Sequence, residues 1–365
     1  MKTNFQFPFY AKVALVFIGL FAFIGMLFIA QHIIVPIIYA TIIAIVLSPI
    51  VEFFVRKKIN RIVAVSITVI FVITITLLVL ALLLTQLMQF SDSVPQLVER
   101  FHNFNQQFVS WVSDTFNIST RKTNLWIKEK NVEFLKETNA LIGQTIVHIG
   151  SILIILVLIP VYVFMILYYQ PLLLGFIHRL FNTEQQTQVN QVLTATKKII
   201  KSYLVGLLLE AGIIAILNSV SLLILGIEYA ILLGVIGAIV NVIPYLGGII
   251  AVALPMIIAL VTKSSITSCV LILVAYVVIQ FIDNHYIIPK VVASKVKVNA
   301  LISVIVVLAG GALWGVPGMF LAIPLTAILK VVFDHIDALK PWGFLLGDTM
   351  PALALFKLKT KNKLP

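Results

Sequence analysis

An acidic residue inside an apolar segment is the first sign of chemistry in this chain. Glu210 lies near the middle of the apolar run from Tyr203 to Leu225, and no Lys or Arg lies one helical turn away. A charge at the centre of a bilayer costs roughly 2.5 to 3.5 kcal/mol on insertion scales, so this carboxylate must be protonated, hydrated or partnered. A proton or sodium coupling site uses such a group, whereas the structural alternative is a neutral Glu hydrogen-bonded between helices or subunits. Asn218 follows at i+8 and shares roughly the same helix face.

Pro and Gly residues interrupt two other apolar stretches and supply the second set of candidates. Pro disrupts a helix and removes a backbone donor, which frees carbonyl groups for a cation or a polar substrate. Asn241 can cap a helix end or coordinate a ligand there, and the alternative is a structural kink stabilised by that Asn. Glycines permit close helix approach and unusual dihedral angles, and packing is the alternative role for each. The candidates at the interruptions are Asn241, Pro244, Gly247, Gly248, Gly310, Gly311, Gly315, Pro317 and Gly318.

A third polar group ends the apolar run from Ile266 to Ile282. It consists of Gln280, Asp283 and Asn284. Gln280 and Asp283 are further candidates for substrate or ion binding, and the alternative for Asp283 is an interfacial charge.

Composition excludes several classes of protein. Of 365 residues, 61% are hydrophobic and 11% charged, with a mean hydropathy of +1.11, against about 25% charged residues in soluble domains. The formal charge of +12 comes from Lys and Arg that lie mostly between apolar runs, where they set orientation and contact membrane lipid rather than nucleic acid. Cys269 is the only cysteine, and the six histidines show no i, i+4 pairing. We therefore expect no cofactor, no metal site and no enzymatic activity.

The two interrupted stretches predict helical hairpins. Tyr229 to Val261 and Asn299 to Phe333 each contain about thirty-four residues, too many for one span of ~20 and too few for two spans plus a turn. Both also run through an Ala-x-Pro step after the break, at Ala253 to Pro255 and Ala322 to Pro324. In a bilayer, backbone freed by Pro and Gly is tolerated only inside protein or beside a water-filled cavity. Paired interruptions of this kind point to a transporter's binding site.

Charge between the apolar runs predicts the membrane orientation. The basic loop at Arg56-Lys57-Lys58 favours a cytoplasmic N-terminus. A first hairpin that returns to the outer face places Lys290, Lys295 and Lys297 inside, and a second that returns to the inner face leaves the basic tail inside. The result is an inverted repeat, Tyr203 to Val261 and Ile266 to Phe333, whose hairpin tips could meet near the midplane with substrate between the repeats.

The predicted fold is an all-α polytopic membrane protein with about eight membrane segments, including the two broken hairpins in an inverted repeat, and a small helical extracytoplasmic region. The first three spans are Val13 to Ala30, Ile33 to Val55 and Ile62 to Phe90, and the last continues as an amphipathic helix past Val94. The expected divisions are N-terminal membrane helices (1–90), the extracytoplasmic region with a second helix over Leu125 to Leu141 (91–145), a membrane helix from Ile146 to Tyr169 with a cytoplasmic amphipathic connector (146–202), a transport core (203–333) and a basic cytoplasmic tail (334–365).

Several of these residues resemble the autoinducer-2 exporter family of PerM-type permeases. The matching features are Tyr203-Leu-Val-Gly206, Leu225-Gly226-Ile-Glu-Tyr229-Ala230, Asn241-Val-Ile-Pro244-Tyr245-Leu-Gly247-Gly248, Gln280-Phe-Ile-Asp283-Asn284 with Pro289, and Gly310-Gly311, Gly315 and Gly318-Met319 with Pro324. Two positions depart from the family's commonest pattern. Leu207 stands where many members carry Gln, and Gly247-Gly248 stands where many have Gly-Pro.

The resemblance implies a bacterial inner-membrane protein of seven or eight membrane segments, assembled as a homo-oligomer, with a pentamer expected. Family members are described as exporters of autoinducer-2, and some relatives look like sodium(lithium)/proton antiporters. The hypothesis from the residues is a secondary transporter that exports a small polar solute by alternating access, with proton or sodium coupling through Glu210. The alternatives are a sodium(lithium)/proton antiporter and a non-transporting membrane scaffold.

Overall fold

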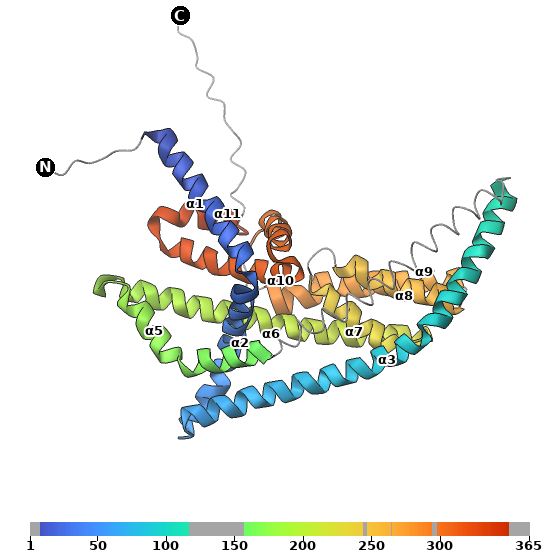
Figure 1. The fold of residues 1–365 in the computed structure, drawn as a ribbon, viewed down its shortest axis with the longest axis horizontal. Coiled ribbons are helices and arrows are strands. Elements are labelled where there is room, and N and C mark those ends of the chain that lie inside the picture. Colours follow the sequence, from blue (N-terminus) through green and yellow to red (C-terminus); the bar gives the residue numbers. More distant parts are fainter. Residues whose placement is uncertain (1–7, 117–156, 244–246, 264, 294–297, 350–365) are drawn as a thin grey trace, which may run out of the picture.

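A computed structural model describes residues 8–116, 157–243, 247–263, 265–293 and 298–349, and the described chain is helical (Figure 1). Six of its helices are long and apolar enough to cross a membrane, or seven if one bent pair counts as a span, and two shorter apolar helices accompany them. The all-α polytopic fold predicted from composition is confirmed.

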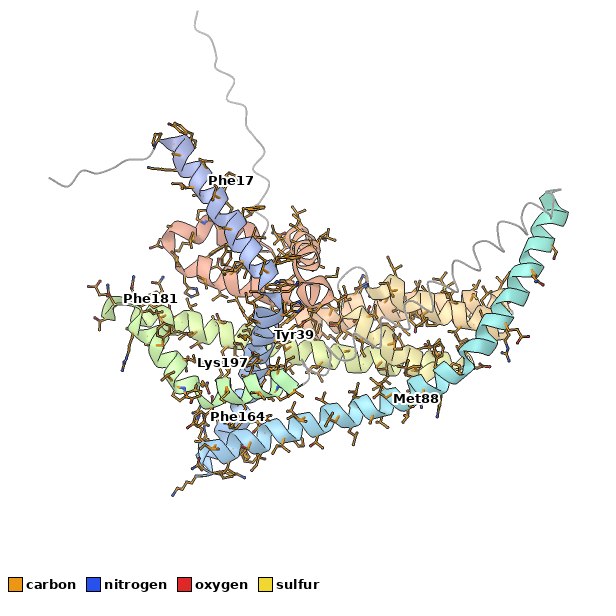
Figure 2. The ribbon with its side chains drawn as sticks, viewed as in Figure 1. Phe17, Tyr39, Met88, Phe164, Phe181 and Lys197 are labelled. Atoms are coloured by element: carbon orange, nitrogen blue, oxygen red, sulfur yellow. The ribbon has the colours of Figure 1, made fainter. Side chains whose placement is uncertain are left out.

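The chain begins with two membrane helices, α1 (Phe9–Ile29) and α2 (Gln31–Arg56), which join at Ala30. No side chain of α1 is buried, and Phe17 projects outward from it in Figure 2. A helix that is apolar on every side and exposed in a single chain suits a lipid environment. The basic segment after α2 forms a turn in which Lys58 has a φ of 65°.

Helix α3 (Arg61–Phe116) is continuous over 56 residues, which corresponds to about 84 Å at 1.5 Å per residue. The predicted extension of this span beyond Phe90 is therefore confirmed. The extension lies beside the loop after α6: the rings of Phe90 and Tyr229 pack edge to face at 5.2 Å, and Arg100 lies 4.0 Å from Glu228. The helix predicted over residues 125–141 lies outside the described residues, as do residues 146–156 of the next predicted span.

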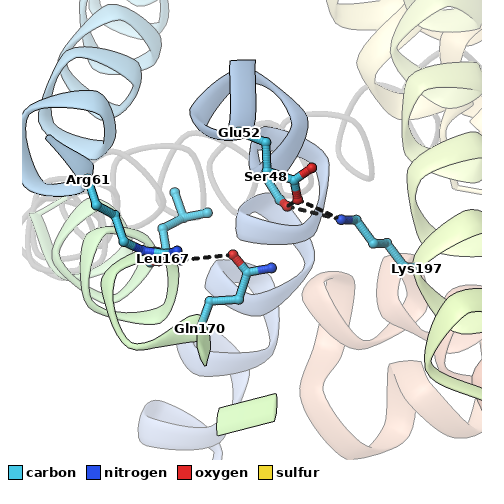
Figure 3. A network of polar contacts seen from close by, with 6 residues as sticks. All are labelled: Ser48, Glu52, Arg61, Leu167, Gln170 and Lys197. Atoms are coloured by element: carbon cyan, nitrogen blue, oxygen red, sulfur yellow. Dashed lines mark hydrogen bonds and ion pairs between the residues drawn. The ribbon is translucent and has the colours of Figure 1, made fainter. Parts of the chain in front are cut away.

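The next segment is a bent pair, Val157–Tyr168 followed by α5 (Gln170–Arg179), with 62° between the two helices. Polar contacts near this bend link α3 to both helices of the pair, and a second set links α2 to α6 (Figure 3). The guanidinium of Arg61 donates to the Leu167 carbonyl at 2.7 Å and to Gln170 at 3.1 Å. On the other side of α2, Lys197 forms an ion pair with Glu52 at 3.0 Å.

Helix α6 (Gln186–Ile224) follows a short 3-10 turn, η1 (Thr183–Gln185). The last part of the expected amphipathic connector, from Gln186, and the expected span from Tyr203 are one continuous helix of 39 residues, whereas the first part of the connector forms α5 and η1. The physical reason is that no Gly or Pro interrupts the chain between Gln186 and Tyr203, so a helix that starts at the connector propagates into the membrane.

The first interrupted stretch forms a helical hairpin, called hairpin 1, from α7 (Ala230–Asn241) and α8 (Gly247–Lys263). Its two ends lie together, because Lys263 donates a 2.6 Å hydrogen bond to the carbonyl of Leu225, just before α7. The helices approach closely where a Cβ on Gly237 would lie 3.5 Å from that of Ala251. The two half-helices predicted from length and the Pro/Gly cluster are confirmed.

The second interrupted stretch, α10 (Ala300–His335), folds back on itself at Trp314 and Gly315, whose backbone angles are not helical. Gly315 has a φ of 64° there, a conformation that glycine adopts without strain. A Cβ on Gly310 would lie 2.5 Å from the carbonyl oxygen of Gly318, so the two arms touch through their backbones. This structure, called hairpin 2, confirms the second prediction.

Hairpin 2 starts and ends at one level of the molecule. The backbone N–H of Asn299, just before the hairpin, donates to the carbonyl of Leu346 in α11 (Lys340–Leu346), which follows the hairpin after η3 (Asp337–Leu339). Its tip contacts the N-terminal helices: Trp314 donates to the Leu27 carbonyl at 3.0 Å, and Tyr39 donates to the Pro317 carbonyl at 3.1 Å.

The expected meeting of the two tips near the midplane stays a prediction, because residues 244–246 at the tip of hairpin 1 lie outside the described residues. The indole N–H of Trp314 donates to a carbonyl in the last turn of α1, and the ring of Phe320 stacks on Tyr39 of α2 at 5.7 Å. These contacts satisfy a polar group and bury aromatic surface at once. Helix α9 (Ile266–Ile282) and the π-helix η2 (Asp283–Ala293) connect the two hairpins.

Candidate functional site

A cavity of about 660 Å³ lies where the tip of hairpin 1 meets α6, the junction of α9 and η2, and the two arms of hairpin 2. This size falls within the range of ligand pockets. Hairpin 2 contributes Ala300 and Ser303 from the start of its first arm and Ile323 from its second arm. The polar side chains in the lining are Tyr203, Glu210, Asn241, Gln280, Asp283, Asn284 and Ser303.

Asp283 is fully buried at this cavity. It lies where α9 ends and the π-helix begins, an arrangement often found at functional sites. Asn241, the last residue of α7, donates to Asp283 Oδ2 at 3.0 Å, and Gln280 makes a longer contact of 3.5 Å to the same oxygen. Asp283 Oδ1 is buried and has no hydrogen-bond partner within the described part of the chain. The carboxylate is therefore held at one oxygen and free at the other.

Glu210 reaches the cavity from α6 and is 5% exposed. None of the described residues forms a hydrogen bond or an ion pair with it. Its carboxyl group interacts electrostatically with that of Asp283. Two buried acids from separate helices therefore line one cavity, and their burial strengthens the interaction between like charges relative to water.

The described lining contains two acids and no Lys, Arg or His. The C-terminus of α7 also belongs to it, through Asn241 and Val242. The C-terminus is the negative end of a helix dipole. Both charge and dipole therefore favour a cation or the hydrogen-bond donors of a polar solute.

Five of the residues predicted from sequence come together at this cavity: Glu210, Asn241, Gly248, Gln280 and Asp283. A Cβ on Gly248 would lie 2.9 Å from Gln280 Oε1, so the glycine lets the hairpin tip approach α9 closely. Pro244, predicted for the same tip, lies outside the described residues.

The other predicted residues lie elsewhere in the structure. Asn218 is buried on α6 with its amide nitrogen facing Gly237 of α7, and Gly247 packs against Val240 and Asn241 inside hairpin 1. In hairpin 2, Gly318 touches Gly310, and a Cβ on Gly311 would lie 2.6 Å from Met319. Gly315 forms the reversal, and Pro317 accepts the hydrogen bond from Tyr39. None of these seven residues is in the cavity lining.

Tyr203 and Ser303 line the cavity but were not among the predicted site residues. Tyr203 precedes Glu210 by seven residues, two helical turns, so the period of α6 could have placed both on one face. Ser303 carried no such signal, because it is brought to the cavity by the reversal of hairpin 2 rather than by a local pattern.

Membrane helices, two broken hairpins and a cavity lined by two acids define a polytopic membrane protein with the architecture of a transporter. Residues 15–338 match the model of the AI-2E family transporter family, and the chain belongs to that family.

Bacterial relatives match over half of the chain or more. YrrI of Bacillus subtilis (strain 168), a transport protein by name, is 25% identical over 84% of this chain and 87% of its own length. The AI-2 transport protein TqsA of Escherichia coli (strain K12) is 26% identical over 87% of this chain and 90% of its own. The permease PerM of the same organism is 26% identical over 52% of this chain and 53% of its own. The chain is a multi-pass membrane protein of a transporter family.

Proposed function

We propose that this protein is a secondary transporter that exports a small polar solute of the autoinducer-2 type through the cavity at the tip of hairpin 1. The observation that carries the proposal is the enclosure of Glu210 and Asp283 in one cavity beside a broken helix. Such broken helices place polar backbone and side chains at the middle of a membrane, where substrate and coupling ion bind. The similarity to TqsA, which is named for AI-2 transport, favours that class of solute.

Glu210 is the residue proposed to couple transport to a cation gradient. It is buried, it lines the cavity, and it comes from α6. A carboxyl group that gains and loses a proton or a sodium ion changes the charge of the cavity, so that loaded and unloaded states differ in energy. The proposed setting is the bacterial inner membrane, with both termini cytoplasmic and the chain in a homo-oligomer.

Replacing Glu210 tests the proposal. We expect Glu210→Gln to abolish transport driven by a pH or sodium gradient, because the amide keeps the shape of the side chain but carries no charge in either state. The measurement is uptake of labelled autoinducer-2 into inverted membrane vesicles with and without an imposed gradient. Glu184→Gln, an identical change at an exposed residue of η1, is the matched control. Gradient-driven transport by Glu210→Gln at the wild-type rate would refute the coupling role.

A sodium(lithium)/proton antiporter is the second candidate, and the pair of acids favours it. In that case the cation itself is the cargo, so sodium added to vesicles should dissipate a pH gradient in the absence of any organic solute. A scaffold that does not transport would show neither uptake of labelled autoinducer-2 nor dissipation of the pH gradient by sodium. The two assays therefore separate the three functions.

A further inference from the structure

Asp283 lines the cavity, and its Oδ1 is buried without a hydrogen-bond partner among the described residues. A buried carboxylate oxygen without a partner is costly, because the desolvation of the group is not repaid. The neighbouring oxygen is already held by Asn241 at 3.0 Å. The arrangement orients Asp283 and leaves Oδ1 available for a ligand.

Further side-chain oxygen atoms belong to residues that line the same cavity. Gln280 Oε1 and Asn241 Oδ1 both lie close to Gly248, at 2.9 and 3.8 Å from the position that a Cβ would occupy there. The carboxyl group of Glu210 belongs to the same cavity. The site thus combines two carboxylates and two amide oxygens contributed by α6, α7 and α9 together with the start of η2.

The donor set determines the class of ligand. It contains oxygen atoms only, which suits hard cations, and no thiolate or imidazole of the kind that zinc, copper or nickel prefers. Ca²⁺ takes six to eight oxygens and Mg²⁺ demands near-octahedral geometry, more than these four side chains supply. In transporters with broken helices, freed backbone and half-helix C-termini coordinate sodium or protons, and the C-terminus of α7 lies at this cavity.

We propose that Asp283, Glu210, Asn241 and Gln280 form a binding site for a monovalent cation of the sodium class, with Asp283 Oδ1 as its primary ligand. The inference rests on the proposed function, because the bound cation would share the cavity with the transported solute. It also gives Asn241 a positioning role: its amide holds one oxygen of Asp283 so that the other faces the ion. The tip of hairpin 1 is thereby part of the ion site.

Thermal unfolding of the full-length protein in lipid nanodiscs tests the site without requiring transport. NaCl or LiCl replaces choline chloride at constant ionic strength. We expect a saturable rise in the melting temperature of the wild type, because a ligand that binds only the folded state stabilises it. Asp283→Asn should lose this rise, and Asp283→Glu, which keeps the carboxylate, should retain it at a weaker affinity. Asp337→Asn, the same change at an exposed residue, should behave as the wild type.

A second variant keeps the test decisive if Asp283→Asn does not fold. Asn241→Ala leaves every carboxylate in place but releases Asp283 and removes one amide oxygen, and we expect its sodium affinity to fall about tenfold or more, as for other residues that orient a metal ligand. Equal melting curves in sodium and choline, an unchanged affinity in Asp283→Asn, or saturation by Ca²⁺ at concentrations where Na⁺ has no effect would each overturn the proposal.

The outcome is distinguishable from failure of the transport proposal. Sodium-dependent stabilisation that requires Asp283, without movement of any organic solute, would support the ion site and refute the exporter function. Solute export by a protein that shows no sodium-dependent stabilisation would support the exporter function and refute the ion site.

Discussion

Glu210 and Asp283 are separated by more than seventy residues, yet they meet in one cavity with different surroundings. Asp283 has an amide partner on one oxygen, while Glu210 has no partner among the described residues. The better-held acid is therefore suited to binding an ion and the other to changing its protonation. Two acids in unequal environments commonly divide such roles.

The glycines of hairpin 2 act through packing. Gly318 lies against the backbone of Gly310, and a Cβ on Gly318 would overlap the Gly310 carbonyl oxygen. Because backbone atoms cannot move aside as a flexible side chain can, we expect Gly318→Ala to destabilise the protein by about 1 to 3 kcal/mol, the usual cost of overpacking. Unfolding in a denaturing detergent series measures this loss.

Gly212→Ala is the matched control for that substitution. Gly212 lies on α6, and no atom lies within 4 Å of the position that its Cβ would occupy. Replacing glycine by alanine inside a helix with free space should be neutral or stabilising, by up to about 1 kcal/mol. Equal stability of the two variants would contradict the close contact of the arms.

At the scale of elements, hairpin 1 is two helices that cross where glycine permits it. The Cβ positions of residues 237 and 251 lie 3.5 Å apart, within the range that disulfides require. In a Cys269→Ser background, we expect Gly237→Cys with Ala251→Cys to form a disulfide on mild oxidation. The measurement is loss of both thiols to a maleimide reagent, restored by reduction.

The control for this pair moves one cysteine to another helix. Gly212→Cys with Ala251→Cys contains the same number of thiols, but no atom lies within 4 Å of the Cβ position at residue 212. Both thiols should remain reactive. If the 237 and 251 pair also stayed reduced, the close crossing of α7 and α8 would be wrong.

Much of this architecture can be predicted from the sequence, because the length of an apolar segment indicates a hairpin and the charge of a loop indicates its side of the membrane. Tyr229 to Val261 is too long for one span, and the structure folds it into α7 and α8. The contact of Asn241 with Asp283 could not be predicted, because it joins residues 42 positions apart and depends on how the hairpin tip meets a π-helix. Nor could the docking of Trp314 on Leu27, 287 residues away.

At the scale of the whole molecule, the two hairpins have separate bases. Lys263 closes the base of hairpin 1 on the loop after α6, and Asn299 closes the base of hairpin 2 on α11. The charge pattern predicts that these bases lie on opposite sides of the membrane. The extension of α3 belongs to the side of hairpin 1, through Phe90 and Tyr229.

Single cysteines in the Cys269→Ser background test this orientation in intact cells. Glu228→Cys, at the base of hairpin 1, should react with a membrane-impermeant maleimide, whereas Asp348→Cys, after α11, should react only once the cells are permeabilised. Lys57→Cys, in the basic turn after α2, serves as an internal reference that should match Asp348→Cys. Labelling of positions 228 and 348 from the same side of the membrane would contradict the predicted inverted repeat.

The unequal attachment of the two hairpin tips has a consequence for any movement. The tip of hairpin 2 is attached to α1 and α2 by hydrogen bonds of Trp314 and Tyr39, neither of which is in the cavity lining. The tip of hairpin 1 is held through Asn241 by Asp283, a group that also faces the cavity. An occupant that competes for Asp283 therefore alters the restraint on hairpin 1, and by reciprocity a displacement of that hairpin alters the occupant's affinity. We therefore expect an occupant of the cavity to act on the position of hairpin 1 more directly than on that of hairpin 2.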